Sequence, residues 1–260
     1  MDDFGDFCYL DVQKTGSTFV TKVLKEVSQR PLRASVKHGV IETPFHRQLL
    51  RVIRRPRWGA FSGGMFRDGC FYFNSVRDPF EYYPSLYNYG CDRRGGVYNR
   101  LQSQGYGHFY DGAQSSFLEW MAFILDEGNA QHVNPVYAAT CAPGVGFFTY
   151  RFLALSVAAP SITLRGINTT ADAEAVLERH NISRATLRNE TLNADLLTLL
   201  ESHLAEHVDL DRARELLTVD DRVNASVSKS ANGDALRASS LAQTVRARDA
   251  LLFRKFYPET

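Results

Sequence analysis

The chain has 260 residues and a formal net charge of +1, and it is 44% hydrophobic and 23% charged. This balance is typical of a globular protein with a substantial core and argues against intrinsic disorder. The near-neutral charge also argues against a nucleic-acid partner, because dedicated nucleic-acid-binding domains are usually basic. Since no linker is visible, we expect one domain over residues 1–260.

The cysteines Cys8, Cys70, Cys91 and Cys141 show neither CxxC spacing nor a neighbouring His at metal-ligand spacing. Buried, reduced thiols are therefore expected, which fits a reducing compartment. The first residues, MDDFGDF, lack the apolar run of a signal peptide. No apolar stretch approaches the roughly 18 residues of a membrane span, so we expect a cytoplasmic protein without a membrane partner.

Strand and helix patterns alternate in the first part of the chain. The apolar run 7–12 predicts a strand, and the apolar spacing from Phe19 to Val27 predicts a helix directly after residues 13–18. Further elements are predicted as a strand over 33–37, a helix over 46–55, a buried strand over 70–76 and a helix from Pro79. This alternation predicts an α/β fold with a central parallel sheet flanked by helices.

The remaining sequence predicts mostly helices. Residues 90–112, rich in Gly, Tyr, Arg and Asn, predict a long surface loop of the kind that often carries function. Beyond it the sequence predicts four helices: over 116–125, over 194–206 with Asn193 as its N-cap, from Asp209 or Asp211, and over 241–256. It also predicts a last strand over 185–192 and a polar loop over 220–234.

The segment Lys14-Thr15-Gly16-Ser17-Thr18 stands between the first predicted strand and its helix. A loop at this place binds anions, because unpaired backbone N–H groups and the helix dipole both favour negative charge. Gly16 permits close approach of the backbone, Ser17 and Thr18 add hydroxyl donors, and Lys14 adds a full charge. The sequence predicts a P-loop-like phosphate cradle, although the Walker A order GxxxxGK[ST] is absent.

A second candidate, Arg77-Asp78-Pro79, follows the buried strand 70–76. Arg77 at the end of a strand suits a phosphate, because the guanidinium fork matches phosphate oxygens. Ser85 follows about two helical turns later. An Arg-Asp-Pro segment can also be a simple turn with an ion pair.

Together the two segments resemble sulfotransferases that use 3′-phosphoadenosine 5′-phosphosulfate (PAPS). Lys14 to Thr18 is similar to the family's 5′-phosphosulfate loop, and Arg77 with Ser85 is similar to its 3′-phosphate motif. Weaker similarity to the carbohydrate-type and bacterial branches extends over SFLEW (116–120), LRNETL (187–192) and the closing segment 248–257. The resemblance also implies a nucleotide contact from Lys229, in the segment 220–229.

The resemblance implies in-line transfer of a sulfuryl group to a hydroxyl or amine, with Lys14 stabilising charge on the leaving phosphate and no metal. Consistent with this, the sequence shows no clear acidic metal site. The acceptor's proton requires a base. His38, in Val36-Lys37-His38-Gly39 after a predicted strand, resembles the site of the family's catalytic His. Related enzymes use Glu, and the alternatives here are His108, Glu42, His46 and His132.

The acceptor is less well defined by the sequence. Arg47, Arg51, Arg54, Arg55 and Arg57 form a basic cluster that fits either a solvated helix face or capture of an anionic glycan. The low net charge and the Tyr-rich segment 90–112 favour a small molecule or oligosaccharide. Two other hypotheses stay open: a P-loop-like small-molecule kinase, and a non-enzymatic glycan-binding protein.

Overall fold

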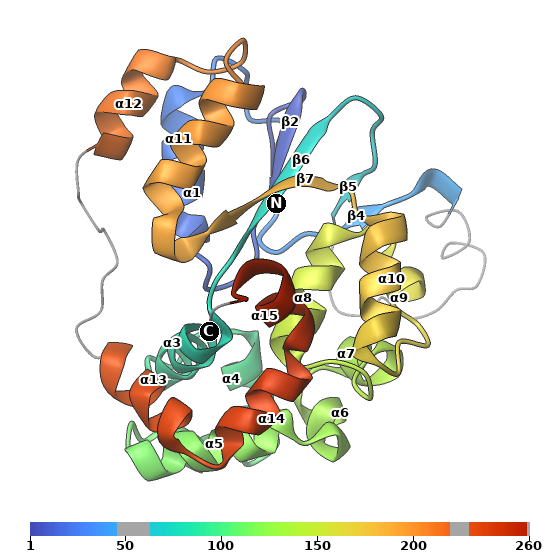
Figure 1. Cartoon of the computed structure of the whole chain (residues 1–260), viewed down its shortest axis with the longest axis vertical. Helices are drawn as coiled ribbons and strands as arrows, with labels where there is room; N and C mark the ends of the chain where they lie inside the picture. Colours follow the sequence, from blue (N-terminus) through green and yellow to red (C-terminus); the bar gives the residue numbers. More distant parts are fainter. Residues whose placement is uncertain (46–62, 219–228, 259–260) are drawn as a thin grey trace. The chain divides into compact units, whose positions relative to one another are not determined.

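The computed structural model describes residues 1–45, 63–218 and 229–258 (Figure 1). The chain divides into two compact units. The first comprises Met1–Arg77, Phe152–Thr163 and Leu177–Asn224, and the second comprises Asp78–Arg151, Leu164–Val176 and Ala225–Thr260. The expectation of one domain over residues 1–260 stays a prediction.

The first unit is built on a five-stranded sheet of order β3-β1-β2-β6-β7. Its strands are β1 (Asp2–Asp3), β2 (Phe7–Leu10), β3 (Ala34–Ser35), β6 (Phe71–Val76) and β7 (Ser183–Arg188). The strands predicted over 7–12, 33–37 and 70–76 are thus confirmed. The last strand begins and ends earlier than predicted, because Asn189–Thr191 forms a 3₁₀ turn (η3).

The prediction of a parallel sheet is correct for β2, β6 and β7 and wrong for the edge, where β1 pairs antiparallel with both β2 and β3. The cause is a tight turn between β1 and β2, closed by a 3.0 Å hydrogen bond from the Phe4 N–H to the Phe7 carbonyl. So short a connection permits only antiparallel pairing. Two successive reversals leave β3 running in the same direction as β2. The ends of β3, β2, β6 and β7 therefore meet at one edge of the sheet, here called the C-terminal edge.

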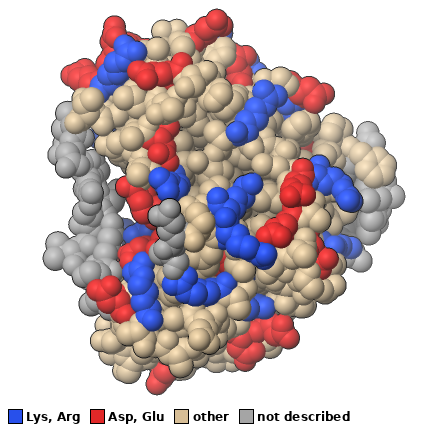
Figure 2. All heavy atoms as spheres, viewed as in Figure 1, with Lys and Arg blue, Asp and Glu red and all other residues tan. Residues whose placement is uncertain are grey.

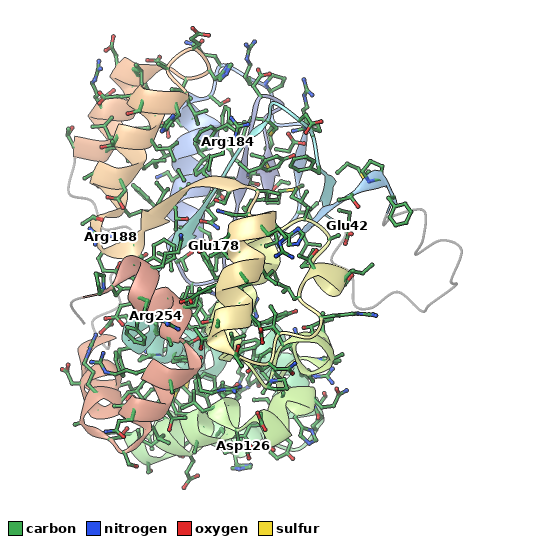
Figure 3. The ribbon with its side chains drawn as sticks, turned by 45° about the vertical axis from the view of Figure 1, so that its right-hand side comes forward. Glu42, Asp126, Glu178, Arg184, Arg188 and Arg254 are labelled. Atoms are coloured by element: carbon green, nitrogen blue, oxygen red, sulfur yellow. The ribbon has the colours of Figure 1, made fainter. Side chains whose placement is uncertain are left out.

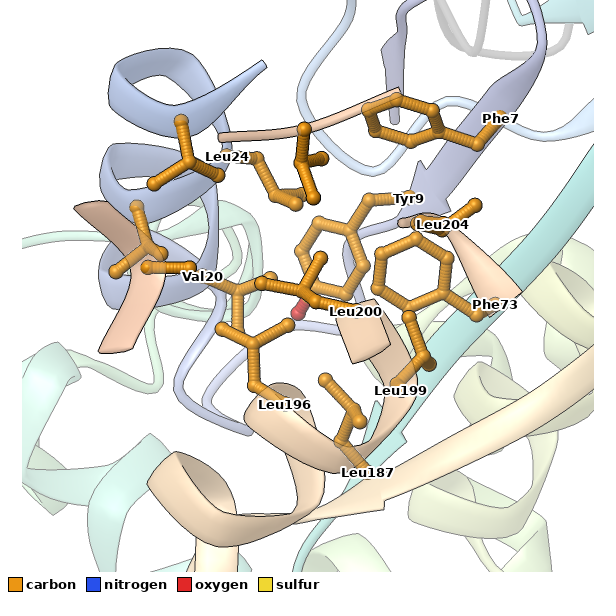
Figure 4. Packing of buried hydrophobic residues seen from close by; sticks show 14 of the residues in the cluster. Phe7, Tyr9, Val20, Leu24, Phe73, Leu187, Leu196, Leu199, Leu200 and Leu204 are labelled. Atoms are coloured by element: carbon orange, nitrogen blue, oxygen red, sulfur yellow. The ribbon is translucent and has the colours of Figure 1, made fainter. Parts of the chain in front are cut away.

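Three helices cover one face of this sheet: α1 (Ser17–Val27), α11 (Leu192–His203) and α12 (Leu210–Thr218). Figure 4 shows apolar side chains of α1 and α11, such as Val20 and Leu200, packed around Tyr9 of β2 and Phe73 of β6. Asn193 does not cap α11 as predicted; the N-cap is Thr191, and Asn193 donates to the Leu217 carbonyl of α12. Asp209 does begin α12, accepting a 3.0 Å hydrogen bond from the Arg212 N–H.

The opposite face of the sheet meets the end of helix α8 (Phe147–Ser156). There Asn74 of β6 donates to Ser156 Oγ at 2.8 Å and accepts from Thr186 Oγ1 of β7 at 2.7 Å. A separate parallel pair, β4 (Ile41–Glu42) and β5 (Gly64–Met65), adjoins this end through a bridge from Ile41 to Ala158, before α9 (Pro160–Thr163). Helices thus flank a sheet whose three parallel strands, β2, β6 and β7, lie side by side, with β7 at the edge.

The second unit is helical. Its elements are α3 (Pro79–Cys91), α4 (Gly96–Ser103), η1 (Gly107–Tyr110), α5 (Gln114–Leu125), η2 (Glu127–Asn129), α6 (Ala130–Val133), α7 (Pro135–Thr140), most of α10 (Thr170–His180), α13 (Lys229–Ala238), α14 (Leu241–Arg248) and α15 (Ala250–Phe256). The helices predicted from Pro79 and over 116–125 are confirmed. No helix in the described part of the chain is long and apolar enough to cross a membrane.

The surface loop predicted over 90–112 is wrong, since α4 and η1 occupy most of it. The reason is aromatic packing. The Tyr110 ring lies 5.1 Å from that of Tyr98 and 5.7 Å from that of Tyr87, and its hydroxyl accepts from Trp120 Nε1. Rings that pack on one another in this way hold the segment against α3 and α5, where a solvated loop would leave them exposed.

The closing helix predicted over 241–256 is broken at Asp249. This fully buried carboxylate accepts hydrogen bonds from the Thr149 N–H, from Thr149 Oγ1 and from the Tyr83 hydroxyl. Burial raises the pKa of Asp249, and the donated hydrogen bonds oppose that effect. The polar loop predicted over 220–234 lies partly outside the described residues; from Lys229 onward it is helical, so there the prediction is wrong.

Candidate functional site

The junction of β2 and α1 turns through two left-handed residues. Lys14 has φ 67° and Gly16, the N-cap of α1, has φ 85°. Gly16 suits this position, because a Cβ there would stand 2.5 Å from Leu192 Cδ2 and 2.9 Å from Asn189 Oδ1. The turn η3 after β7 and the first residue of α11 therefore lie close to Gly16.

Four consecutive backbone N–H groups of the loop, after Lys14, have no hydrogen-bond partner in the described part of the chain. Within the described residues, those of Thr15, Gly16, Ser17 and Thr18 make no well-formed hydrogen bond. The first turn of α1 also lacks an acidic residue and a side-chain cap. Consecutive unpaired amides at a helix N-terminus, with a lysine in the same turn, favour the binding of an anion.

A chain of buried hydroxyl groups fixes the loop to β6. Thr15 Oγ1 donates to the Val12 carbonyl at 2.8 Å and lies 2.6 Å from Ser75 Oγ, which lies 2.6 Å from the Tyr9 hydroxyl. Because the single proton of Thr15 is used on Val12, Ser75 must donate to Thr15 and Tyr9 must donate to Ser75. Thr15 is fully buried, so its hydroxyl supports the loop.

Arg77 lies at the same edge of the sheet as the loop. Leu10 of β2 pairs with Asn74 of β6, so continuing that register places Arg77 level with Gln13, the residue before Lys14. The Arg77 side chain is 7% exposed. The last residue of β7, Arg188, pairs with Val76 and is exposed, which adds a second guanidinium at the C-terminal edge (Figure 3).

His38 belongs to this edge as well, after β3. Its backbone N–H donates to Asp11 Oδ1 at 2.8 Å, and its ring Nδ1 lies 2.7 Å from the Asp11 carbonyl oxygen. Since a carbonyl only accepts, Nδ1 carries the proton, and the lone pair of the neutral ring is on Nε2. His38 is 23% exposed at its side chain, so it is positioned to receive a proton from a bound molecule.

The structure therefore brings the loop Lys14 to Thr18, Arg77 and His38 to one edge of the first unit. Glu42 lies on β4 in the same unit. The other predicted site residues belong to the second unit: Ser85 to α3, His108 to η1, His132 to α6 and Lys229 to the first position of α13. His46 and the cluster Arg47, Arg51, Arg54, Arg55 and Arg57 lie outside the described residues.

Two residues of this edge escape the sequence prediction. Asp11 stands in the otherwise apolar run FCYLDV, and Ser75 follows Asn74 in the mostly apolar run CFYFNSV. A polar residue in a buried strand is itself a signal, because it must find a hydrogen-bond partner. The sequence does not show which partner it finds.

Acidic and basic side chains are intermixed on the face shown in Figure 2. A shallow pocket of about 200 Å³ opens at the starts of β6 and β7, the edge opposite the loop, beside Arg184 and Arg67. The Arg67 guanidinium already donates hydrogen bonds to both carboxylate oxygens of Asp3. Among the described residues, no three His, Cys, Asp or Glu side chains gather as metal ligands.

Comparison of the chain with family models, curated proteins and solved structures found no match. The residues and geometry of the C-terminal edge are therefore the evidence for function.

Replacing Gly16 by Ala tests the geometry of the loop. We expect a loss of about 1–2 kcal/mol in the free energy of unfolding from the left-handed backbone. Overpacking should add about 1 kcal/mol, the lower end of its usual range, because Leu192 Cδ2 and Asn189 Oδ1 are side-chain ends that can shift. Gly69→Ala is the matched control, because its φ is 81° and a Cβ there meets nothing within 4 Å. Urea unfolding measures both. Equal losses in the two variants would contradict the close packing at Gly16.

Proposed function

We propose that the chain is a PAPS-dependent sulfotransferase whose phosphosulfate-binding loop is Lys14 to Thr18. The observation that carries the proposal is the run of unpaired N–H groups from Thr15 to Thr18. These groups directly follow Lys14, and Arg77 follows the neighbouring strand β6 at the same edge of the sheet. A P-loop-like cradle of this kind suits the 5′-phosphosulfate, and Arg77 suits a second phosphate on the same nucleotide.

Each charged or polar group has a separate role in the proposed reaction. Loop amides and Lys14 stabilise the negative charge that develops on the leaving phosphate oxygen. His38 Nε2 takes the proton of the acceptor hydroxyl or amine as the acceptor atom bonds to sulfur and the bond from sulfur to the phosphate oxygen breaks. The electron pair of that broken bond leaves with 3′-phosphoadenosine 5′-phosphate (PAP). Positioning and electrostatics supply the catalysis, and the proposal requires no metal.

The acceptor in this proposal is a small molecule or oligosaccharide. Ser85 as a 3′-phosphate contact and Lys229 as a nucleotide contact stay predictions, as does a cytoplasmic location. The acceptor's identity, and the choice between O- and N-sulfation, follow from a transfer screen with labelled PAPS.

The nucleotide that stabilises the protein tests the proposal. PAP at 100 times its Kd should add about 2.7 kcal/mol to the free energy of unfolding and raise Tm accordingly. ATP with Mg²⁺ should have little effect. Stabilisation by ATP with Mg²⁺ alone would favour a kinase, and an absence of any nucleotide effect would favour a non-enzymatic protein. Either outcome contradicts the proposal.

Two substitutions separate the roles of the charged residues. Lys14→Ala should slow sulfuryl transfer about 10²–10³-fold, because a donor to the developing charge is lost. Arg77→Ala should chiefly weaken PAP binding, by roughly 1.5–3 kcal/mol, since a hydrogen bond to a charged group is lost. Single-turnover kinetics and PAP titration measure the two effects.

The controls are exposed cations of the same elements or sheet: Lys22→Ala on α1 and Arg184→Ala on β7. Both should leave turnover and PAP affinity near wild type. Wild-type behaviour in Lys14→Ala and Arg77→Ala would show that the loop and the strand end are not the nucleotide site.

A further inference from the structure

Asp11 combines features of a residue that supports a catalytic histidine. It directly follows β2, three positions before Lys14, and it is 4% exposed. A carboxylate this deeply buried needs hydrogen-bonding or charged partners that offset the free-energy cost of its desolvation. Asp11 Oδ1 accepts from the His38 N–H and from the Met1 nitrogen, while Asp11 Oδ2 lies 3.4 Å from His38 Nδ1.

Main-chain and side-chain atoms of Asp11 act on His38 in different ways. The Asp11 carbonyl accepts a hydrogen bond from His38 Nδ1–H and so fixes the ring tautomer. The carboxylate holds the His38 N–H, which keeps His38 in a left-handed conformation at φ 53°. Such a backbone conformation persists only where its surroundings impose it. The same carboxylate faces the ring nitrogen that is positively charged once Nε2 has taken a proton.

We propose that Asp11 is the positioning residue for His38, orienting the ring for proton acceptance at Nε2 and stabilising the imidazolium that results. This inference rests on the proposed function for its catalytic consequence. Its structural part, the Nδ1–H tautomer and the Asp11 contacts, is independent of the substrate. A dyad in this arrangement contributes to the transition state and leaves nucleotide binding to Lys14 and Arg77.

Asp11→Asn tests the proposal, because the amide oxygen can still accept the His38 N–H while the charge is removed. We expect kcat to fall about 10- to 100-fold, with KM for PAPS and PAP affinity within about twofold of wild type. Asp2→Asn is the matched control. Asp2 is 3% exposed and accepts from Thr21 and Ser35, so it is a similarly buried carboxylate without a His38 contact.

A double-mutant cycle separates positioning from general stability. If Asp11 acts through His38, Asp11→Asn should cause no further loss of kcat in a His38→Ala background. A full additional loss there, or a wild-type kcat in the single Asp11→Asn variant, overturns the proposal. A parallel loss in Asp2→Asn would assign the effect to stability, which also overturns it.

Nitrogen NMR of the wild-type His38 ring needs no variant and no substrate. The neutral ring should carry its proton on Nδ1, and a ring protonated on Nε2 would overturn the inference even if Asp11→Asn fails to fold. A protein that binds no PAP and transfers no sulfate would contradict the proposed function. Transfer that is indifferent to Asp11→Asn would contradict this inference alone.

Discussion

The site depends on the hydrogen bond between Thr15 and Ser75. This contact joins the loop after β2 to the adjacent parallel strand β6, two residues before Arg77. The direction of the chain from Tyr9 through Ser75 and Thr15 to Val12 follows from the count of hydroxyl protons. Each buried hydrogen bond of this kind contributes about 1 kcal/mol and, more importantly, costs more if one partner is lost. The loop is thus held by side-chain hydroxyls, which leaves its backbone N–H groups to a ligand.

The hydrophobic packing beneath the loop makes this arrangement stiff. Val20 and Leu24 of α1 are fully buried against Tyr9, so the helix that begins at Ser17 cannot shift without opening the core. From the other side, Leu192 and Asn189 limit the space at Gly16. Preorganised donors of this kind stabilise developing charge without a reorganisation cost at the moment of reaction.

The sequence was most informative where local chemistry decides the structure. The apolar runs before Gln13 and Arg77 predicted both strands, and helical spacing from Phe19 to Val27 predicted α1. The antiparallel edge followed from a turn at Phe4 whose hydrogen bond has no sequence signature. The Gly content of the segment 90–112 favours a loop, whereas the packing of Tyr98 and Tyr110 depends on partners in other elements, such as Tyr87 and Trp120. Asp11 escaped prediction for the same reason, since its partner His38 is 27 residues away.

The central claim is that the amides of Thr15 to Thr18 bind the nucleotide's phosphosulfate end, and backbone amide NMR tests it most directly. Titration with PAP should shift the amide proton signals of Thr15, Gly16, Ser17 and Thr18, because each N–H gains a charged acceptor. Gly69, at the opposite edge of the sheet, should be unaffected. Saturable PAP binding that leaves the four loop amides unshifted would contradict the account.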